Sequence, residues 1–261
     1  MVIGVIGGSG LYEVDGLSIS KEVSLLTPFG EPSSTYRIGK IGNIELAFLP
    51  RHGTPHSIPP HKVNYRANIW GFKSLGVNRI ISVNAVGGIN RDLPPGTIVL
   101  QDQIIDRTSG RQQTFYDSDK VVHIDFTDPY CNEMRELCIA AAAESSIAVQ
   151  NSATYICVNG PRLETAAEIR FFADNGADIV GMTAMPETSL ARELEICVLG
   201  VSVVTNYAAG IVAAHKLTAK EVVEKMKDST ALIKRLLSAL VPKLPEARSC
   251  PCSNALKDAG L

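Results

Sequence analysis

Short apolar runs alternate with segments of helical periodicity along the chain, and this alternation constrains its fold most strongly. Strands that alternate with helices usually build a mixed or mostly parallel sheet covered by helices. No Pro/Ser/Gly linker occurs before Pro242, so we expect one α/β domain over residues 1–241 and a ragged tail over 242–261. The expected strands are residues 2–6, 44–49, 79–83, 97–101, 153–158, 178–182 and 197–205, and the expected helices 62–75, 131–144, 165–175, 185–195 and 219–240.

The charge balance argues against a nucleic-acid partner. Twenty-five basic and 27 acidic side chains give a formal net charge of −2, and no basic block is present. The N-terminal segment lacks the basic flank of a signal peptide. The apolar stretch 196–214 contains Ser202, Thr205 and Asn206, which favours a buried strand and loop over a membrane span. We therefore expect a cytoplasmic protein without a membrane or nucleic-acid partner.

Small, polar or anion-binding residues follow several of the predicted strands. Ser9 lies in a glycine turn, and the turn's backbone N–H groups and the serine hydroxyl could together cradle an anion. Arg51 could act as a planar anion clamp with His52 beside it. Asn84 and Thr205–Asn206 follow two further strands. Each turn alone could be merely structural, but ligands collect at the carboxyl ends of strands in open α/β sheets, so the set predicts a binding site.

Glu164 precedes the predicted helix 165–175 closely enough to be read as part of its first turn. An acid in that place can simply complement the helix dipole, so a purely structural role of Glu164 is the alternative to a role in ligand binding. Thr218 and Glu221 carry the spacing of a capping box before the last helix.

Three histidines, at positions 52, 56 and 61, raise the possibility of a metal site. The prolines at 55, 59 and 60 prevent the helix that would align them, and no carboxylate lies in the cluster, so we expect no metal there. Cys250 and Cys252 flank a proline near the C-terminus; two thiols are too few for zinc unless a second pair joins them. A local disulfide or free thiols both remain open for them.

Eight motifs together resemble the trimer-type purine nucleoside phosphorylases and their 5′-methylthioadenosine phosphorylase relatives, over about residues 1–240. The motifs are GVIGGSG, LPRHGTPH, KVNYRANIW, SVNAVGGI, IDRT, NGPRLET, GMTAMPE and VVTNYAAG, in the order and spacing of that family. The resemblance implies the nucleoside phosphorylase fold, a central mixed and partly barrel-like sheet flanked by helices. It also implies that phosphate attacks C1′ of a purine nucleoside and releases the free base and a sugar 1-phosphate.

The resemblance assigns roles residue by residue. It places phosphate on Ser9, Arg51, His52, Asn84, Ala85 (through its backbone) and Thr183. It places the base on Leu163, Glu164, Asn206 and Ala208, where Leu163 replaces the usual phenylalanine, and the ribose on Met182. Asn206, Glu164 and His52 become the catalytic candidates. His123 corresponds to a residue that completes a neighbouring subunit's site, and Ala219 and Val222 to the lining of the 5′ pocket.

Further expectations follow from these matches. We expect a homotrimer or a hexamer, phosphate as co-substrate, and no cofactor or metal. Asn206 and Ala208 replace two aspartates of the methylthioadenosine enzymes, which favours 6-oxopurine nucleosides such as inosine, guanosine or 5′-methylthioinosine. The main alternative function is that of a 5′-methylthioadenosine phosphorylase. Two other function classes are a metallohydrolase built on the histidine cluster and a nucleoside-binding sensor that is not an enzyme. Some archaeal members carry disulfides, which suggests the pairs Cys138–Cys197 and Cys250–Cys252, although free thiols explain the same residues.

Overall fold

The computed structural model describes residues 1–8, 18–118, 120–212 and 219–260, without the side chains of residues 219–228. Its strands form one mixed sheet and are β1 (Val2–Gly7), β2 (Ser18–Val23), β3 (Tyr36–Ile41), β4 (Ile44–Pro50), β5 (Val77–Gly88), β6 (Ile98–Leu100), β7 (Gln103–Arg107), β8 (Val149–Gln150), β9 (Thr154–Val158), β10 (Ile179–Gly181) and β11 (Cys197–Tyr207). The helices are α1 (Tyr65–Ser74), α2 (Asn132–Glu144), α3 (Ala166–Asp174), α4 (Ala184–Glu193) and α5 (Ala219–Leu240), with short 3₁₀ turns η1 (Pro60–Lys62), η2 (Val241–Lys243) and η3 (Pro251–Asn254).

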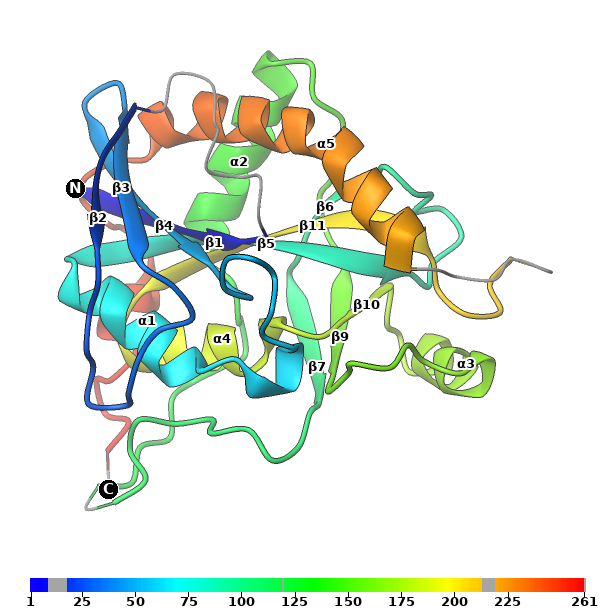
Figure 1. Ribbon diagram of the computed structural model, residues 1–261, viewed down its shortest axis with the longest axis horizontal. Coiled ribbons are helices and arrows are strands. Elements are labelled where there is room, and N and C mark those ends of the chain that lie inside the picture. Colours follow the sequence, from blue (N-terminus) through cyan, green and yellow to red (C-terminus); the bar gives the residue numbers. More distant parts are fainter. Residues whose placement is uncertain (9–17, 119, 213–218, 261) are drawn as a thin grey trace.

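Strand β5 joins the parts of the sheet. One of its edges pairs in parallel with β11 along Arg79–Gly88. Its other edge pairs with β1 up to Ser82 and with β10 only at Gly87 and Gly88. Residues 83–86 therefore face a gap between β1 and β10 on that edge. The sheet divides at this gap into a part with β1 to β4 and a part with β10, β9 and β7 (Figure 1).

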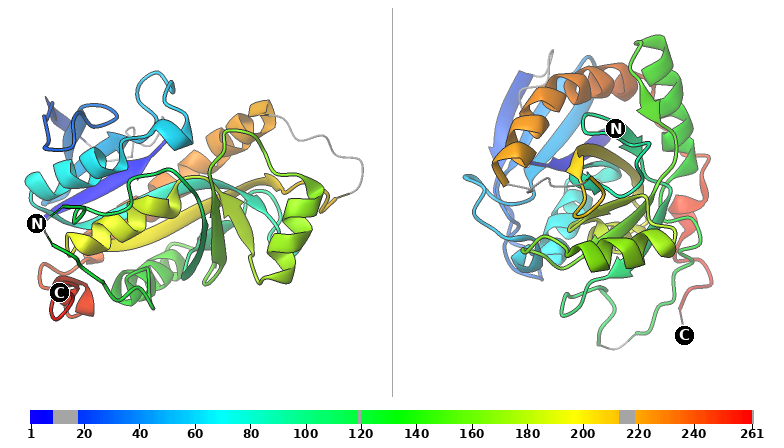
Figure 2. Two further views of the ribbon diagram at one scale, coloured as in Figure 1. Left: turned by 90° about the horizontal axis from the view of Figure 1, so that it is seen from below. Right: turned by 90° about the vertical axis from the view of Figure 1, so that its right-hand side faces the viewer.

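Two helical layers cover the sheet. Helices α2 and α5 pack on one face and α1 and α4 on the opposite face, while α3 lies at the far end beside β9 and β10 (Figures 1 and 2). The alternation of side chains along β11 explains the layers: Leu199 and Val201 pack with α2 and α5, whereas Val198 packs with α1 and α4. The expected α/β class and the mixed sheet are therefore confirmed.

The C-terminal segment is packed rather than ragged. Leu244, Cys252 and Ala259 are buried, and Arg79 donates from Nη2 to the carbonyl of Ala247 at 2.9 Å. The segment lies beside α2 and the loop before it (Figure 2), and Gly260 forms an antiparallel bridge with Val122.

The predicted disulfide pairs are absent from this structure. All six cysteines are free thiols, and the sulfur of Cys197 lies with those of Cys131, Cys250 and Cys252 instead of with Cys138. The reason is the placement of α2: its start, at Cys131, meets the start of β11 through a backbone hydrogen bond to Val198 of 2.8 Å, and Cys138 lies further along the helix. No helix in the described part of the chain is long and apolar enough to span a bilayer.

Candidate active site

Arg51 follows β4 and is buried in an ion pair. Its Nε and Nη2 atoms lie 2.7 and 2.9 Å from the carboxylate oxygens of Glu187 on α4, and its Nη1 donates to the carbonyl of Val83 at 3.0 Å. Burial lowers the pKa of Arg51, but the charge and the hydrogen bonds of Glu187, with smaller effects of Tyr65 and Tyr155, together raise it overall. Glu187 thus occupies the Nε–Nη2 edge of the guanidinium, so an anion could reach Arg51 only from its Nη1 side. One N–H of Nη1 is left for a ligand.

Asn84 and Thr183 extend this polar network across the sheet. The Thr183 hydroxyl donates to Asn84 Oδ1 at 2.7 Å, and Asn84 Nδ2 lies 3.3 Å from the hydroxyl of Ser82. Ser82 in turn donates to Glu187 at 2.6 Å. Strand β5 continues past Asn84 to Gly88, so Asn84 lies within the strand and not after it as expected. The predicted residues after β4, within β5 and after β10 are nevertheless brought together, although they are far apart in the chain.

Ala85 lies in the middle of β5 but is exposed, whereas its neighbours on both sides are buried. It belongs to the stretch that neither β1 nor β10 covers. Because the carbonyl of Val83 points to the uncovered edge, where it accepts from Arg51, the alternation of a strand directs the N–H of Ala85 to the same edge. An exposed alanine and an edge amide in a buried strand mark open space there.

His52 is held as a neutral ring. Its Nδ1 lies 2.8 Å from the carbonyl of Ile58, so Nδ1 carries the proton and Nε2 is an acceptor. Burial lowers the pKa of His52 to about 4, and the charge of Arg51 adds to this effect. The ring of His56 stacks on it at 4.3 Å between centroids.

Glu164 does not belong to helix α3, contrary to the first-turn interpretation. The helix begins after Thr165, and Thr165 and Glu168 form its capping box. Arg162 also pairs with Glu168, at 2.7 Å, and not with Glu164. Burial raises the pKa of Glu164. Since Glu168 fulfils the capping role, Glu164 does not serve as the cap of α3. Its carboxyl therefore remains available for a ligand.

Asn206 and Ala208, at the end of β11, are buried and adjoin the segment that carries Glu164. Ala208 packs with Ile169 of α3, and a Cβ built on Gly210 would lie 2.7 Å from the Cβ of Ala166. The Asn206 amide donates to the Tyr207 carbonyl at 2.9 Å and accepts from the Thr205 hydroxyl at 2.8 Å. These bonds use one of the two N–H groups and one of the two oxygen lone pairs of the Asn206 amide, so one N–H and one lone pair are left.

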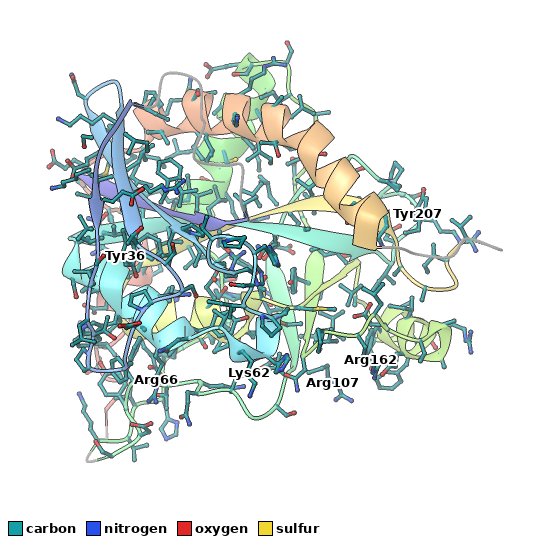
Figure 3. The ribbon with its side chains drawn as sticks, viewed as in Figure 1. Tyr36, Lys62, Arg66, Arg107, Arg162 and Tyr207 are labelled. Atoms are coloured by element: carbon teal, nitrogen blue, oxygen red, sulfur yellow. The ribbon has the colours of Figure 1, made fainter. Side chains whose placement is uncertain are left out.

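Met182 packs against Gly160, which has a φ of +63° and whose built Cβ would lie 2.3 Å from the Met182 sulfur. Leu163 is 42% exposed. A cavity of about 550 Å³ opens beside Gly160 and Glu164 and extends to Phe171 and Arg107. Tyr207, Arg162 and Arg107 lie around this same end of the molecule (Figure 3). Of the predicted base residues only Glu164 lines this cavity, and neither Asn84 nor Thr183 does.

The structure says less about the remaining predicted site residues. Ser9 and the side chains of Ala219 and Val222 lie outside the described residues, as does Thr218 of the predicted capping box. His123 is exposed and donates its backbone N–H to Ala259 at 2.8 Å.

Two residues of the polar network were not among the predicted site residues. Glu187 is 1% exposed and Ser82 2% exposed, and both hold Arg51. The sequence offered one signal for Glu187, a carboxylate shortly after the strand-end residues Met182 and Thr183. Within the described residues, the only group of at least three candidate metal ligands consists of cysteines, so the three histidines do not form such a group.

Comparison with known proteins identifies the family. The model of the phosphorylase superfamily matches residues 2–242. The chain is 57% identical to a probable S-methyl-5′-thioinosine phosphorylase of Thermodesulfovibrio yellowstonii, over 98% of this chain and 96% of the relative. It is 51% identical to the S-methyl-5′-thioadenosine phosphorylase of Thermofilum pendens, over 98% and 97%. It is 48% identical to the 6-oxopurine nucleoside phosphorylase of Pyrococcus furiosus, over 98% of both.

A solved structure agrees with these sequence matches. The methylthioadenosine phosphorylase of Schistosoma mansoni in complex with adenine superposes with a TM-score of 0.93 at 33% identity, over 99% of this chain and 96% of that one. The expected fold is thereby confirmed along nearly the whole chain. On the family match, the relatives and the shared fold, this chain belongs to the phosphorylase superfamily, as an enzyme of the purine nucleoside phosphorylase type, a pentosyltransferase.

Proposed function

We propose that the enzyme cleaves 6-oxopurine nucleosides with phosphate and prefers a 5′-methylthio substituent, as in 5′-methylthioinosine. One observation carries the base preference: the carboxyl of the half-buried Glu164 lines a cavity, while Glu168 caps the helix and binds Arg162. A carboxylate in that position can accept from N1–H, which hypoxanthine and guanine have and adenine lacks. Against adenine it would face the lone pair of N1.

Asn206 supports the same preference. Its free N–H can donate to O6 of a 6-oxopurine, and its free lone pair can accept from a protonated N7. An aspartate in this position would be an acceptor only, which suits the 6-amino group of adenine and repels O6. Buried polar mismatches of this kind can discriminate between substrates by about 10⁴–10⁵-fold in favourable sites.

The proposed mechanism needs no nucleophilic side chain. Phosphate attacks C1′ as the purine leaves, so positive charge builds on the ribosyl ring and negative charge on the base. Thr183, Asn84, the N–H of Ala85 and the remaining N–H of Arg51 would hold the phosphate. Neutral His52 would accept a hydrogen bond at Nε2 from the phosphate hydroxyl. The amide oxygen of Asn206 would accept a hydrogen bond from the protonated N7 of the leaving purine.

The 5′ preference depends on the family match. Ala219 and Val222, which correspond to the pocket lining, offer no partner for a 5′-hydroxyl. An unpaired buried hydroxyl costs about 1–3 kcal/mol, so a methylthio group should bind better. The expected homo-oligomer belongs to the same proposal, because His123 would complete a neighbour's site. The alternative substrate is 5′-methylthioadenosine, the substrate named for the Thermofilum pendens relative.

A substrate panel tests both specificities. We would measure kcat/KM with phosphate for inosine, guanosine, adenosine, 5′-methylthioinosine and 5′-methylthioadenosine, with a phosphate-free arm as control. We expect 5′-methylthioinosine to be the best substrate and the adenine nucleosides to be poor. A kcat/KM for 5′-methylthioadenosine equal to that for 5′-methylthioinosine would refute the base preference. A higher kcat/KM for inosine than for 5′-methylthioinosine would refute the 5′ preference. Turnover that does not depend on phosphate would refute the reaction itself.

A further inference from the structure

Four cysteine sulfurs meet at the end of the sheet opposite the carboxyl ends of β5 and β11. Cys131 is the N-cap residue of α2, and Cys197 is the first residue of β11. In the C-terminal segment, Cys250 is the N-cap residue of η3 and Cys252 lies within η3. Their Sγ atoms all lie within 4.8 Å of one another, and those of Cys197 and Cys250 are 3.4 Å apart. The pair Cys250 and Cys252, too few for a metal by themselves, is thus joined by a second pair.

The spacing of these sulfurs suits a tetrahedral metal. Zinc bound by four thiolates has Zn–S distances of about 2.3 Å, which place neighbouring sulfurs about 3.8 Å apart. The Cys197–Cys250 sulfur separation of 3.4 Å is slightly below that value, and no two of the four sulfurs are more than 4.8 Å apart. Cys250 and Cys252 are separated by one residue, closer than the usual spacing of such ligands, but η3 turns both sulfurs toward the same point. Four soft donors select zinc over the hard cations.

The surroundings of the cluster compensate the charge of such a site. Zinc with four thiolates carries a net charge of −2, and the four thiol protons leave to solvent when the metal binds. Nη1 of Arg248 lies 3.9 Å from the sulfur of Cys197 and is held at 2.5 Å by the carbonyl of Glu195. Cys131 and Cys252 are nearly inaccessible, 1% and 2% exposed, as expected for a closed structural site.

We propose that Cys131, Cys197, Cys250 and Cys252 bind one structural Zn²⁺ ion that fastens the C-terminal segment to the core. The segment then runs on to the loop that carries His123, where Gly260 pairs with Val122 and Ala259 accepts from the N–H of His123. The metal therefore also fixes the base of that loop. This site departs from the sequence-based expectation of no metal, and it does not depend on the proposed substrate.

Metal content tests the site directly. The full-length protein is prepared with reductant and without chelator, supplied with Zn²⁺, desalted, and analysed by elemental mass spectrometry. We expect one zinc per chain. Cys252→Ser should reduce zinc to a trace, whereas Cys138→Ser, which alters a buried cysteine outside the cluster, should retain one per chain. A wild-type protein without zinc, or a Cys252→Ser variant that keeps it, would overturn the proposal.

A second measurement uses only the wild-type chain, so it does not depend on whether the variants fold. Co²⁺ added to reduced, metal-free protein should give the sulfur-to-cobalt charge-transfer absorption of a tetrathiolate site, and an equal amount of Zn²⁺ should abolish that absorption. Absence of the band, with the four thiols found joined in two disulfides under the same reducing conditions, would refute the metal site.

Discussion

Arg51 and Glu187, which lie 136 positions apart in the sequence, form a buried ion pair through two parallel hydrogen bonds of 2.7 and 2.9 Å. The pair joins the end of β4 to α4, and Ser82 links Glu187 to Asn84, another of the residues proposed to hold phosphate. Both side chains are 2% exposed, so neither charge can be satisfied by water if the other is removed.

Glu187→Gln should therefore destabilise the protein. Loss of the carboxylate leaves the guanidinium of Arg51 buried without a counter-charge, which should lower the free energy of unfolding by about 3–5 kcal/mol in urea unfolding. Phosphate should raise the melting temperature of the variant more than that of the wild type, because a bound anion replaces the lost charge. Glu22→Gln, which removes the exposed partner of Arg37, is the matched control and should cost less than about 1 kcal/mol. Similar losses for both variants would contradict the argument.

Gly160→Ala should reduce activity through Met182. Gly160 and Gly176 both have positive φ, so alanine strains the backbone at either position by about 1–2 kcal/mol. Only the Cβ at position 160 meets Met182; position 176 faces open space. We expect kcat/KM to fall by up to about 100-fold in Gly160→Ala, because the methionine proposed to lie under the ribose is displaced, and to stay near the wild-type value in Gly176→Ala. Steady-state kinetics of the folded variants checks this prediction. Equal kcat/KM values in Gly160→Ala and Gly176→Ala would contradict it.

Asn206→Asp should move the base preference toward adenine nucleosides. A carboxylate cannot donate to O6, and one mispaired buried hydrogen bond costs about 1–3 kcal/mol, so the ratio of kcat/KM for the two bases should change by about tenfold or more. Adding Ala208→Asp should enlarge the change. Asn151→Asp introduces the same charge at an exposed position and should leave the ratio as it is. An unchanged ratio in Asn206→Asp would show that this amide does not read the base.

His52 should make the protein less stable as the pH falls. Its pKa is about 4 in the folded protein against 6.5 unfolded, so between these values the unfolded state binds a proton that the folded state does not. Stability from this group is complete above about pH 6.5 and is lost as the pH falls toward 4. Urea unfolding at about pH 7 and about pH 5 should show a smaller decline for His52→Gln than for the wild type. His61→Gln, at an exposed histidine, should behave like the wild type. An undiminished decline in His52→Gln would reject this assignment.

His123→Ala should weaken activity without unfolding the protein, if His123 completes the site of a neighbouring subunit. Its side chain is exposed in the single chain, and its backbone bond to Ala259 does not require the imidazole. We expect a higher KM for the nucleoside together with an unchanged melting temperature and mass by light scattering. A fully active monomeric wild-type enzyme would contradict the shared site.

Local sequence patterns predicted the elements around the site but not how its charges are paired. The predicted last helix, 219–240, has the observed bounds, and Gly76 and Gly176 follow α1 and α3 with positive φ as expected of helix ends. Strands β2 and β3 were missed, because Ser18–Val23 and Tyr36–Ile41 carry charged residues without long apolar runs. The pairing of Arg51 with Glu187 could not be foreseen, since it depends on a contact between distant segments. The same holds for the meeting of Cys131 and Cys197 with the C-terminal pair.

The two ends of the active site differ in how freely they can evolve. Around Arg51, one change disturbs several partners at once, because Glu187, Ser82, Asn84 and Thr183 are joined by successive hydrogen bonds. Leu163, Glu164 and Ala208 lie outside this interlocked set. Selection can therefore exchange the side chains proposed to read the base a few at a time, while the hydrogen-bonded set around Arg51 stays intact. Relatives named for thioinosine, thioadenosine and 6-oxopurine substrates at 57%, 51% and 48% identity are what such an arrangement allows.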